Sequence, residues 1–372
     1  MNEARSGQIR PLTGLRFIAA LMVFGSHLAW VGVGPMGQGV IDQGFFGVSF
    51  FFMLSGFVLM HSYAEPLRQG HTSPWVYVGL RVARLWPLHV FMALPYLFLA
   101  ARRGDLDPVA ALSNLLLLQS WVPDSTVYFS LNGPTWSLSN EAFFYLAFLW
   151  LVHWPDRLRH VLTLALLTVV LTGAVCMHFW FSDAKVAGAY TLAHWLFYVF
   201  PAFRLLEFLV GMWLHDLWRQ GWLNWRMPAW AAFVLLGACM LFGQQVPEPF
   251  RYSLFYLPAA VCLLVAHLGQ VRTRWHAFLS SDVLQALGKA SFAFYVVHMA
   301  VVRQVIKAFP WVESTAWIEV PLLLVLCCMV AWLVHRGVER PVEQAARRWL
   351  TARPPILGSA PSRAHPQAPK LG

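Results

Sequence analysis

Repeated apolar runs of about 20 residues constrain this chain more than any other feature. An α-helix needs roughly 20 apolar residues to cross the hydrocarbon core of a bilayer. We find ten candidate runs, at about 14–33, 43–63, 81–101, 137–153, 158–180, 194–216, 228–246, 253–270, 286–308 and 316–335. A shorter run at 113–122 is too brief to cross, and we expect it to be interfacial or re-entrant. The sequence predicts an all-α, polytopic membrane protein with about ten transmembrane helices.

Composition agrees with a lipid environment. The chain is 58% hydrophobic and only 12% charged, about half the charged fraction of soluble domains. Its net charge of +10 is spread between the apolar runs, so we exclude nucleic acid as a partner and expect the lipid bilayer instead. The five cysteines lie inside apolar stretches with neither a disulfide framework nor a zinc spacing, and no metal site is predicted.

The distribution of basic residues predicts the orientation. With the N-terminus inside, 20 of the 27 Lys and Arg fall on the cytoplasmic side, six fall outside, and Arg204 falls within a span. Cytoplasmic loops carry such an excess, so both termini are expected in the cytoplasm. We divide the chain into a transmembrane domain over 1–342 and a basic, disordered cytoplasmic tail over 343–372.

Ionisable residues inside a span are candidates for function because charge in hydrocarbon is costly. Arg16 and His27 are 11 residues apart in the first span, close to three helical turns, so they share a face roughly 16 Å apart along the axis. A neutral imidazole in a dry site suits a general base. The alternatives are a topology anchor for Arg16 and a structural histidine for His27.

Two further groups combine charge with apolar surroundings. Arg81 and Arg84 share a helix face at a membrane edge, where they form a phosphate clamp or an anchor to lipid phosphates. Helix capping explains the polar residues before Glu141, but an acid entering an apolar helix needs a partner. Residues 204 and 207 are an expected intramembrane ion pair, which more often holds helices together than does chemistry. The histidine at 298 is mid-span, where a structural role is the simpler interpretation.

Seven motifs in a fixed order resemble the acyltransferase type 3 family, integral-membrane O-acyltransferases that modify bacterial glycans and related acceptors. They are R-x10-H at Arg16 and His27, FFFMLSGFVL at 50–59, RVARLWP at 81–87, WSLSNEAFFY at 136–145, RLLEFLVG at 204–211, SFAFYVVH at 291–298 and ERP at 339–341. The resemblance covers about residues 10–342. One position departs from the pattern: many members have Asp where this chain has Ser49.

The resemblance implies a ten-helix domain in the bacterial inner membrane. It implies acyl-coenzyme A, commonly acetyl-coenzyme A, as co-substrate, and a glycan or lipid-linked saccharide as acceptor. Among the residues, it implies that His27 is catalytic, that Arg16 is required, and that Arg81 and Arg84 handle the donor. Glu141 is a further catalytic candidate. The remaining candidates for substrate or donor contacts are Trp136, Ser137, Ser139, Arg204, Glu207 and His298.

In the expected reaction His27 deprotonates an acceptor hydroxyl as it attacks the thioester. An acyl-histidine intermediate is the competing route. A transporter or flippase is the alternative function, with Arg204, Glu207 and the histidines lining a path; it would move substrate without consuming a thioester. A purely structural protein explains poorly why Arg16 and His27 share a face. The acceptor, the acyl-chain length and the oligomeric state stay open.

Overall fold

The computed structural model describes residues 9–30, 39–223, 227–268, 273–309 and 316–352. Within these ranges the regular structure is helical, apart from isolated β-bridges that join Asp124 to Ala187 and Lys185 to Thr191. Among the described residues, seven segments are long and apolar enough to cross a membrane. An eighth consists of two helices bent by 67°. The all-α, polytopic prediction is confirmed.

The eight segments contain most of the apolar runs found in the sequence. They are α1 (Arg10–Trp30); η2 (Ile41–Phe45) with α2 (Phe46–Arg68); α3 (Pro74–Arg103); α7 (Asp156–Trp180); α8 (Leu192–His194), η5 (Trp195–Val199) and α9 (Pro201–Arg219); α11 (Glu248–Phe250), η7 (Arg251–Phe255) and α12 (Leu257–Leu268); the bent pair α14 (Asp282–Lys289) and α15 (Ser291–Ala308); and α16 (Ala316–Val334) with η9 (His335–Glu339) and α17 (Arg340–Thr351).

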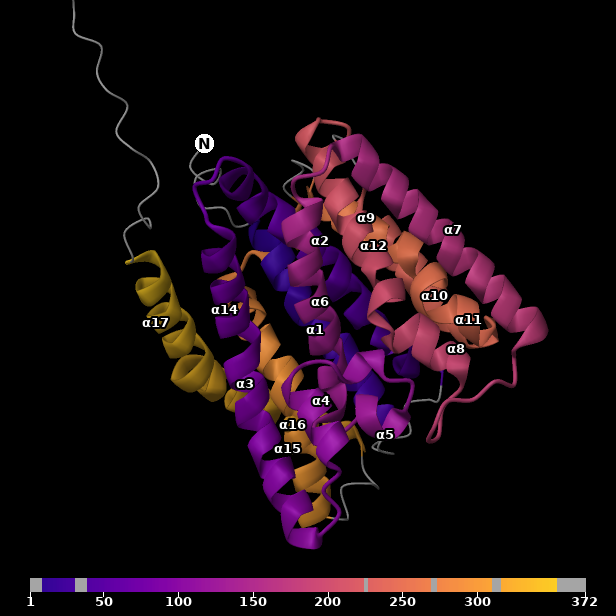
Figure 1. Ribbon diagram of the computed structural model, residues 1–372, viewed down its shortest axis with the longest axis vertical. Helices are drawn as coiled ribbons and strands as arrows, with labels where there is room; N and C mark the ends of the chain where they lie inside the picture. Colours follow the sequence, from indigo (N-terminus) through magenta and orange to yellow (C-terminus); the bar gives the residue numbers. More distant parts are fainter. Residues whose placement is uncertain (1–8, 31–38, 224–226, 269–272, 310–315, 353–372) are drawn as a thin grey trace, which may run out of the picture.

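Shorter elements complete the bundle. Two are apolar helices, α6 (Trp136–Leu151) and α10 (Ala229–Phe242), the second followed by η6 (Gly243–Gln245). The short run at 113–122 gives no span: it contains the end of α4 (Pro108–Leu115) and η3 (Gln119–Trp121). With α5 (Ser125–Tyr128), α4 lies toward one end of the bundle (Figure 1). Then η4 (Gly133–Thr135) leads into α6, and α13 (Arg274–Leu279) precedes α14.

Glycines let α2 pack tightly against α9. A Cβ on Gly56 would lie 2.0 Å from the carbonyl oxygen of Phe208, and a Cβ on Gly211 would lie 1.9 Å from that of Met53. Two helix backbones therefore touch directly at this crossing, as is common where small residues face each other in membranes. The contact fixes α2, which supplies much of the site described below, against the helix that contains Arg204.

The predicted disordered tail is wrong for residues 343–351, which belong to α17. This helix runs beside α3, at the edge of the bundle (Figure 1). It is too polar to be recognised as a span, but two tertiary contacts hold it: Glu343 binds Arg84, and Leu350 lies over Gly79 of α3. Residues 353–372 lie outside the described residues, so the rest of that prediction is not tested.

Candidate active site

A cavity of about 110 Å³ lies between five helices. It is lined from α1, α2, α3, α6 and α15, by Arg16, Val48, Phe51, Phe52, Leu54, Ser55, Val58, Leu59, Arg81, Arg84, Ser137, Leu138, Glu141, Tyr145, Ser291, Phe292 and Tyr295. Five of the residues predicted from the sequence are among them: Arg16, Arg81, Arg84, Ser137 and Glu141. We call this space the inner cavity.

One end of the inner cavity holds a carboxylate among three arginines. Glu141 accepts a hydrogen bond from the Tyr145 hydroxyl at 3.0 Å and lies in the electrostatic field of Arg84, Arg16 and Arg81. Arg81 donates to the Tyr63 hydroxyl at 2.7 Å, and its guanidinium lies over that ring, 4.8 Å from the centroid. The partner that Glu141 needed is therefore a set of cations from α1 and α3.

A second cavity, of about 350 Å³, shares Arg16, Arg81 and Arg84 with the first. Its other lining residues come from α1, α3, α14, η9 and α17, and they are Thr13, Leu80, Gly288, Lys289, His335, Arg340, Glu343, Gln344 and Arg347. We call this space the basic mouth. Its six Lys and Arg side chains face one carboxylate, Glu343, so it favours a ligand with several negative charges.

Arg84 stands where the two cavities meet. Its Nη1 atom is 2.8 Å from Glu343 Oε1 and 3.8 Å from Glu339 Oε1. Glu339 is buried and also contacts His335 Nδ1 at 2.8 Å. The carboxylates of the ERP motif and of α17 thus occupy the guanidinium that an anionic ligand would contact.

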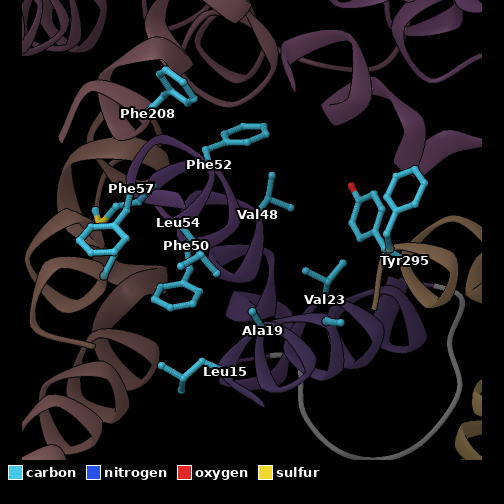
Figure 2. Packing of buried hydrophobic residues seen from close by; sticks show 14 of the residues in the cluster. Leu15, Ala19, Val23, Val48, Phe50, Phe52, Leu54, Phe57, Phe208 and Tyr295 are labelled. Atoms are coloured by element: carbon cyan, nitrogen blue, oxygen red, sulfur yellow. The ribbon is translucent and has the colours of Figure 1, made fainter. Parts of the chain in front are cut away.

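Tyr295 lines the inner cavity from α15. Its hydroxyl donates to the carbonyl of Pro134 at 2.8 Å and is 2.7 Å from Ser137 Oγ. Figure 2 shows this ring on α15 with its hydroxyl turned toward Val48 of α2, which lines the same cavity. The ring centroid of Tyr295 is 6.0 Å from that of His298. Tyr295 therefore lies between the cavity that it lines and His298.

His27 and His298 contact each other. Nε2 of His298 is 3.2 Å from Nδ1 of His27, and the ring centroids are 5.0 Å apart. His298 is buried and stacks on Phe294, at 5.9 Å between centroids. The structure thus brings two predicted residues together from helices that are 271 residues apart in sequence. Arg16 lies on the cavity as expected, and His27 is not among its lining residues.

Arg204 and Glu207 form the predicted ion pair, at 2.8 Å and with both side chains fully buried. Arg204 also donates to Ser253 Oγ and to Ser49 Oγ, each at 3.0 Å. Ser49, the position that departs from the expected motif, thus touches this arginine. The pair is not part of the lining of the inner cavity; Phe52, 5.1 Å below the guanidinium, lies between them.

Two more predicted residues lie beside the cavity rather than in its lining. Trp136 is buried against Tyr198, 4.6 Å between ring centroids, and Ser139 is buried on the same helix.

Sequence reasoning missed Tyr145, Tyr295, Lys289 and Glu343 as site residues. Tyr145 could have been predicted from the sequence, because it lies one helical turn after Glu141 and so faces the same way.

Comparison with known proteins decides the class of chemistry. The profile of a family described as "Acyltransferase domain" matches residues 10–336. The chain belongs to this acyltransferase family. The family and enzyme class expected from the motifs are confirmed, and the acyltransferase is a multi-pass membrane protein that transfers acyl groups.

Curated relatives agree with that assignment. The acyltransferase is 32% identical to acyltransferase MdmB of Streptomyces mycarofaciens, with 97% of both chains covered. It is 25% identical to YrhL of Bacillus subtilis (strain 168), which has a provisional name as a peptidoglycan O-acetyltransferase, over 92% of this chain and 56% of that protein. A third match, 33% identical to "Protein 2 in picA locus" of Rhizobium radiobacter, covers 35% of this chain and 75% of the other. No solved structure shows significant similarity.

Proposed function

We propose that this acyltransferase moves an acyl group, most simply acetyl, from cytoplasmic acyl-coenzyme A to a hydroxyl of a glycan or lipid-linked saccharide. One observation supports acyl-coenzyme A as the donor: the basic mouth and the inner cavity share Arg16, Arg81 and Arg84. Guanidinium groups bind phosphate oxygens in bidentate geometry, and coenzyme A has phosphates at one end and the reactive thioester at the other. The phosphates would bind in the mouth and the thioester would enter the cavity.

The inner cavity suits a short acyl group. Its volume is about 110 Å³, which favours a small group over a long acyl chain. Its walls include Val48, Phe51 and Phe52, which offer an apolar surface to a methyl group. The name of YrhL includes peptidoglycan, and this supports a glycan as acceptor.

The proposed orientation has ten crossings in the bacterial inner membrane. Eight segments meet length and composition limits for a span when the bent pair is counted. The shorter apolar helix over Ala229–Gln245 would be a ninth crossing, and α6, with 16 residues, would be the tenth. Twenty of 27 Lys and Arg then lie inside, in accord with the positive-inside rule. The basic mouth is lined by the start of α1 and by α17, so in this proposed orientation it would open to the cytoplasm, where acyl-coenzyme A is available.

His27 would be the general base. As the acceptor oxygen attacks the thioester carbonyl carbon, its proton passes to the imidazole. The carbon–sulfur bond then breaks, and the coenzyme A thiolate takes up that proton. Arg16 and Glu141 lie with the donor arginines, so their part is to hold the donor and balance its charge. Attack by His27 itself on the thioester is the alternative route, and it gives an acyl-histidine.

The test uses purified protein in liposomes with acetyl-coenzyme A, and follows free thiol over time. We expect thiol release that rises when a glycan acceptor is added and that is lost in His27→Ala. A matched control is His267→Ala, which removes a buried histidine on α12 away from both cavities. If folded wild-type protein neither binds nor consumes any acyl-coenzyme A, the donor assignment is wrong and transport becomes the leading hypothesis.

A further inference from the structure

Backbone carbonyls beside His27 and His298 show which ring nitrogen of each carries the hydrogen. His27 Nδ1 lies 2.9 Å from the carbonyl oxygen of Val23, and His298 Nδ1 lies 3.2 Å from that of Phe294. A carbonyl oxygen only accepts hydrogen bonds, and a neutral imidazole has one donor and one acceptor nitrogen. Both rings therefore carry their hydrogen on Nδ1.

This arrangement leaves one consistent direction for the contact between the rings. Nε2 of His298 has a lone pair and accepts from the Nδ1–H of His27, 3.2 Å away, so that this hydrogen is shared between Val23 and His298. The reverse direction would place a lone pair of His27 against the carbonyl oxygen of Val23, and a lone pair of His298 against that of Phe294. Both contacts would be repulsive.

We propose that His298 is a positioning residue that holds His27 as the Nδ1–H tautomer, so that Nε2 of His27 receives the proton of the acceptor hydroxyl. This inference rests on the proposed function for its catalytic part. When Nε2 gains the proton, the imidazolium keeps its Nδ1–H directed at a lone pair of His298. A neutral partner thus does the orienting that a carboxylate does in many hydrolases.

The surroundings hold His298 in place for this role. Its ring stacks on Phe294 at 5.9 Å and meets Phe24 edge-on at 6.2 Å, and Tyr295 lies 6.0 Å away toward the inner cavity. Rotation of the His298 ring would need these aromatic side chains to move. The tautomer of His27 is therefore built into the packing of α1 against α15.

Two substitutions separate this role from mere packing. His298→Phe keeps a planar ring but removes the acceptor atom, and we expect kcat to fall about 10–100-fold with KM for acetyl-coenzyme A unchanged. His298→Gln places an amide oxygen near the lost Nε2, and it should restore most of kcat. His267→Phe on α12 is the matched control and should leave kcat unchanged. If His298→Phe retains wild-type kcat, or if Gln rescues nothing in a folded protein, the proposal is overturned.

Nitrogen-15 NMR of histidine-labelled protein reads the tautomer without any need for activity. His27 is assigned by its loss in His27→Gln. His267 gives an internal reference for the Nδ1–H form, because its Nδ1 lies 2.7 Å from Leu263 O and its Nε2 accepts from Trp275 Nε1–H at 3.0 Å. We expect the His27 signal to match this reference in wild type and to gain an Nε2–H component in His298→Phe. An Nε2–H signal for wild-type His27 overturns the inference, even if acyl transfer is established or the variants misfold. Conversely, if the His27 signal matches that of His267 in a protein that shows no acyl transfer, the tautomer is supported and only the proposed function is refuted.

Discussion

The direct contact between α2 and α9 makes a quantitative prediction. Gly56→Ala would place a Cβ 2.0 Å from a backbone oxygen of Phe208, where ordinary contact begins at 3.4 Å, so the helices would have to separate by about 1.4 Å. Neither partner is a flexible side chain. Overpacking of this kind lowers the free energy of unfolding by about 1–3 kcal/mol. Gly211→Ala should have a similar effect, because its Cβ would lie 1.9 Å from Met53 O.

Gly237→Ala is the matched control, because a Cβ there meets nothing within 4 Å. It lies inside α10, so the intrinsic preference of Ala for helices should stabilise it by up to about 1 kcal/mol. The control and Gly56→Ala should thus differ by about 1–4 kcal/mol in the free energy of unfolding. Tryptophan fluorescence during denaturation in detergent micelles measures the midpoints. If Gly56→Ala and Gly211→Ala are as stable as the control, the backbones do not approach as described and the reasoning fails.

Three further predictions concern charge. Arg84→Ala should raise KM for acyl-coenzyme A about tenfold or more, since a charge-assisted hydrogen bond contributes about 1.5–3 kcal/mol, and steady-state thiol release measures it; an unchanged KM would remove Arg84 from the donor site. Glu343→Gln, which frees Arg84 from a competing carboxylate 2.8 Å away, should lower the Kd of coenzyme A in calorimetry; a weaker complex would mean that the pair orders Arg84 for binding. Glu207→Leu leaves a buried charge at Arg204 and should destabilise by about 3–5 kcal/mol, whereas Arg204→Met combined with it should recover much of the loss in the same denaturation assay. A double variant no more stable than the single one would contradict that account.

Hydropathy was sufficient to predict most of the bundle, because backbone groups in lipid must be satisfied within helices. The Arg204–Glu207 ion pair was also predictable, because its i, i+3 spacing is a local feature of one helix. Hydropathy failed for α17, a helix with a polar composition that is held by tertiary contacts. Its Ala, Arg, Gln and Glu residues favour a helix, and Pro341 lies in the first turn, but hydropathy alone does not register these signals.

The site was predictable residue by residue but not as an arrangement. Each of Arg16, Arg81 and Glu141 is unusual in its own apolar run, and that signal is local. The proximity of these side chains depends on which helices pack against each other, and the spacing of residues along one helix does not reveal the packing. The partner of His27 was missed for the same reason: nothing near residue 27 indicates a side chain 271 residues away. Sequence reasoning offered Glu141 as a further catalytic candidate, whereas the side chain that the structure places against His27 is His298.

The outer wall of the basic mouth comes from one terminal helix. Arg340, Glu343 and Arg347 all belong to α17, which packs against α3. Because these three charged side chains share one helix, a shift of α17 against α3 would change the charge of the mouth in a single movement. The docking of α17 thus couples the shape of the entrance to its electrostatic attraction for an anionic ligand.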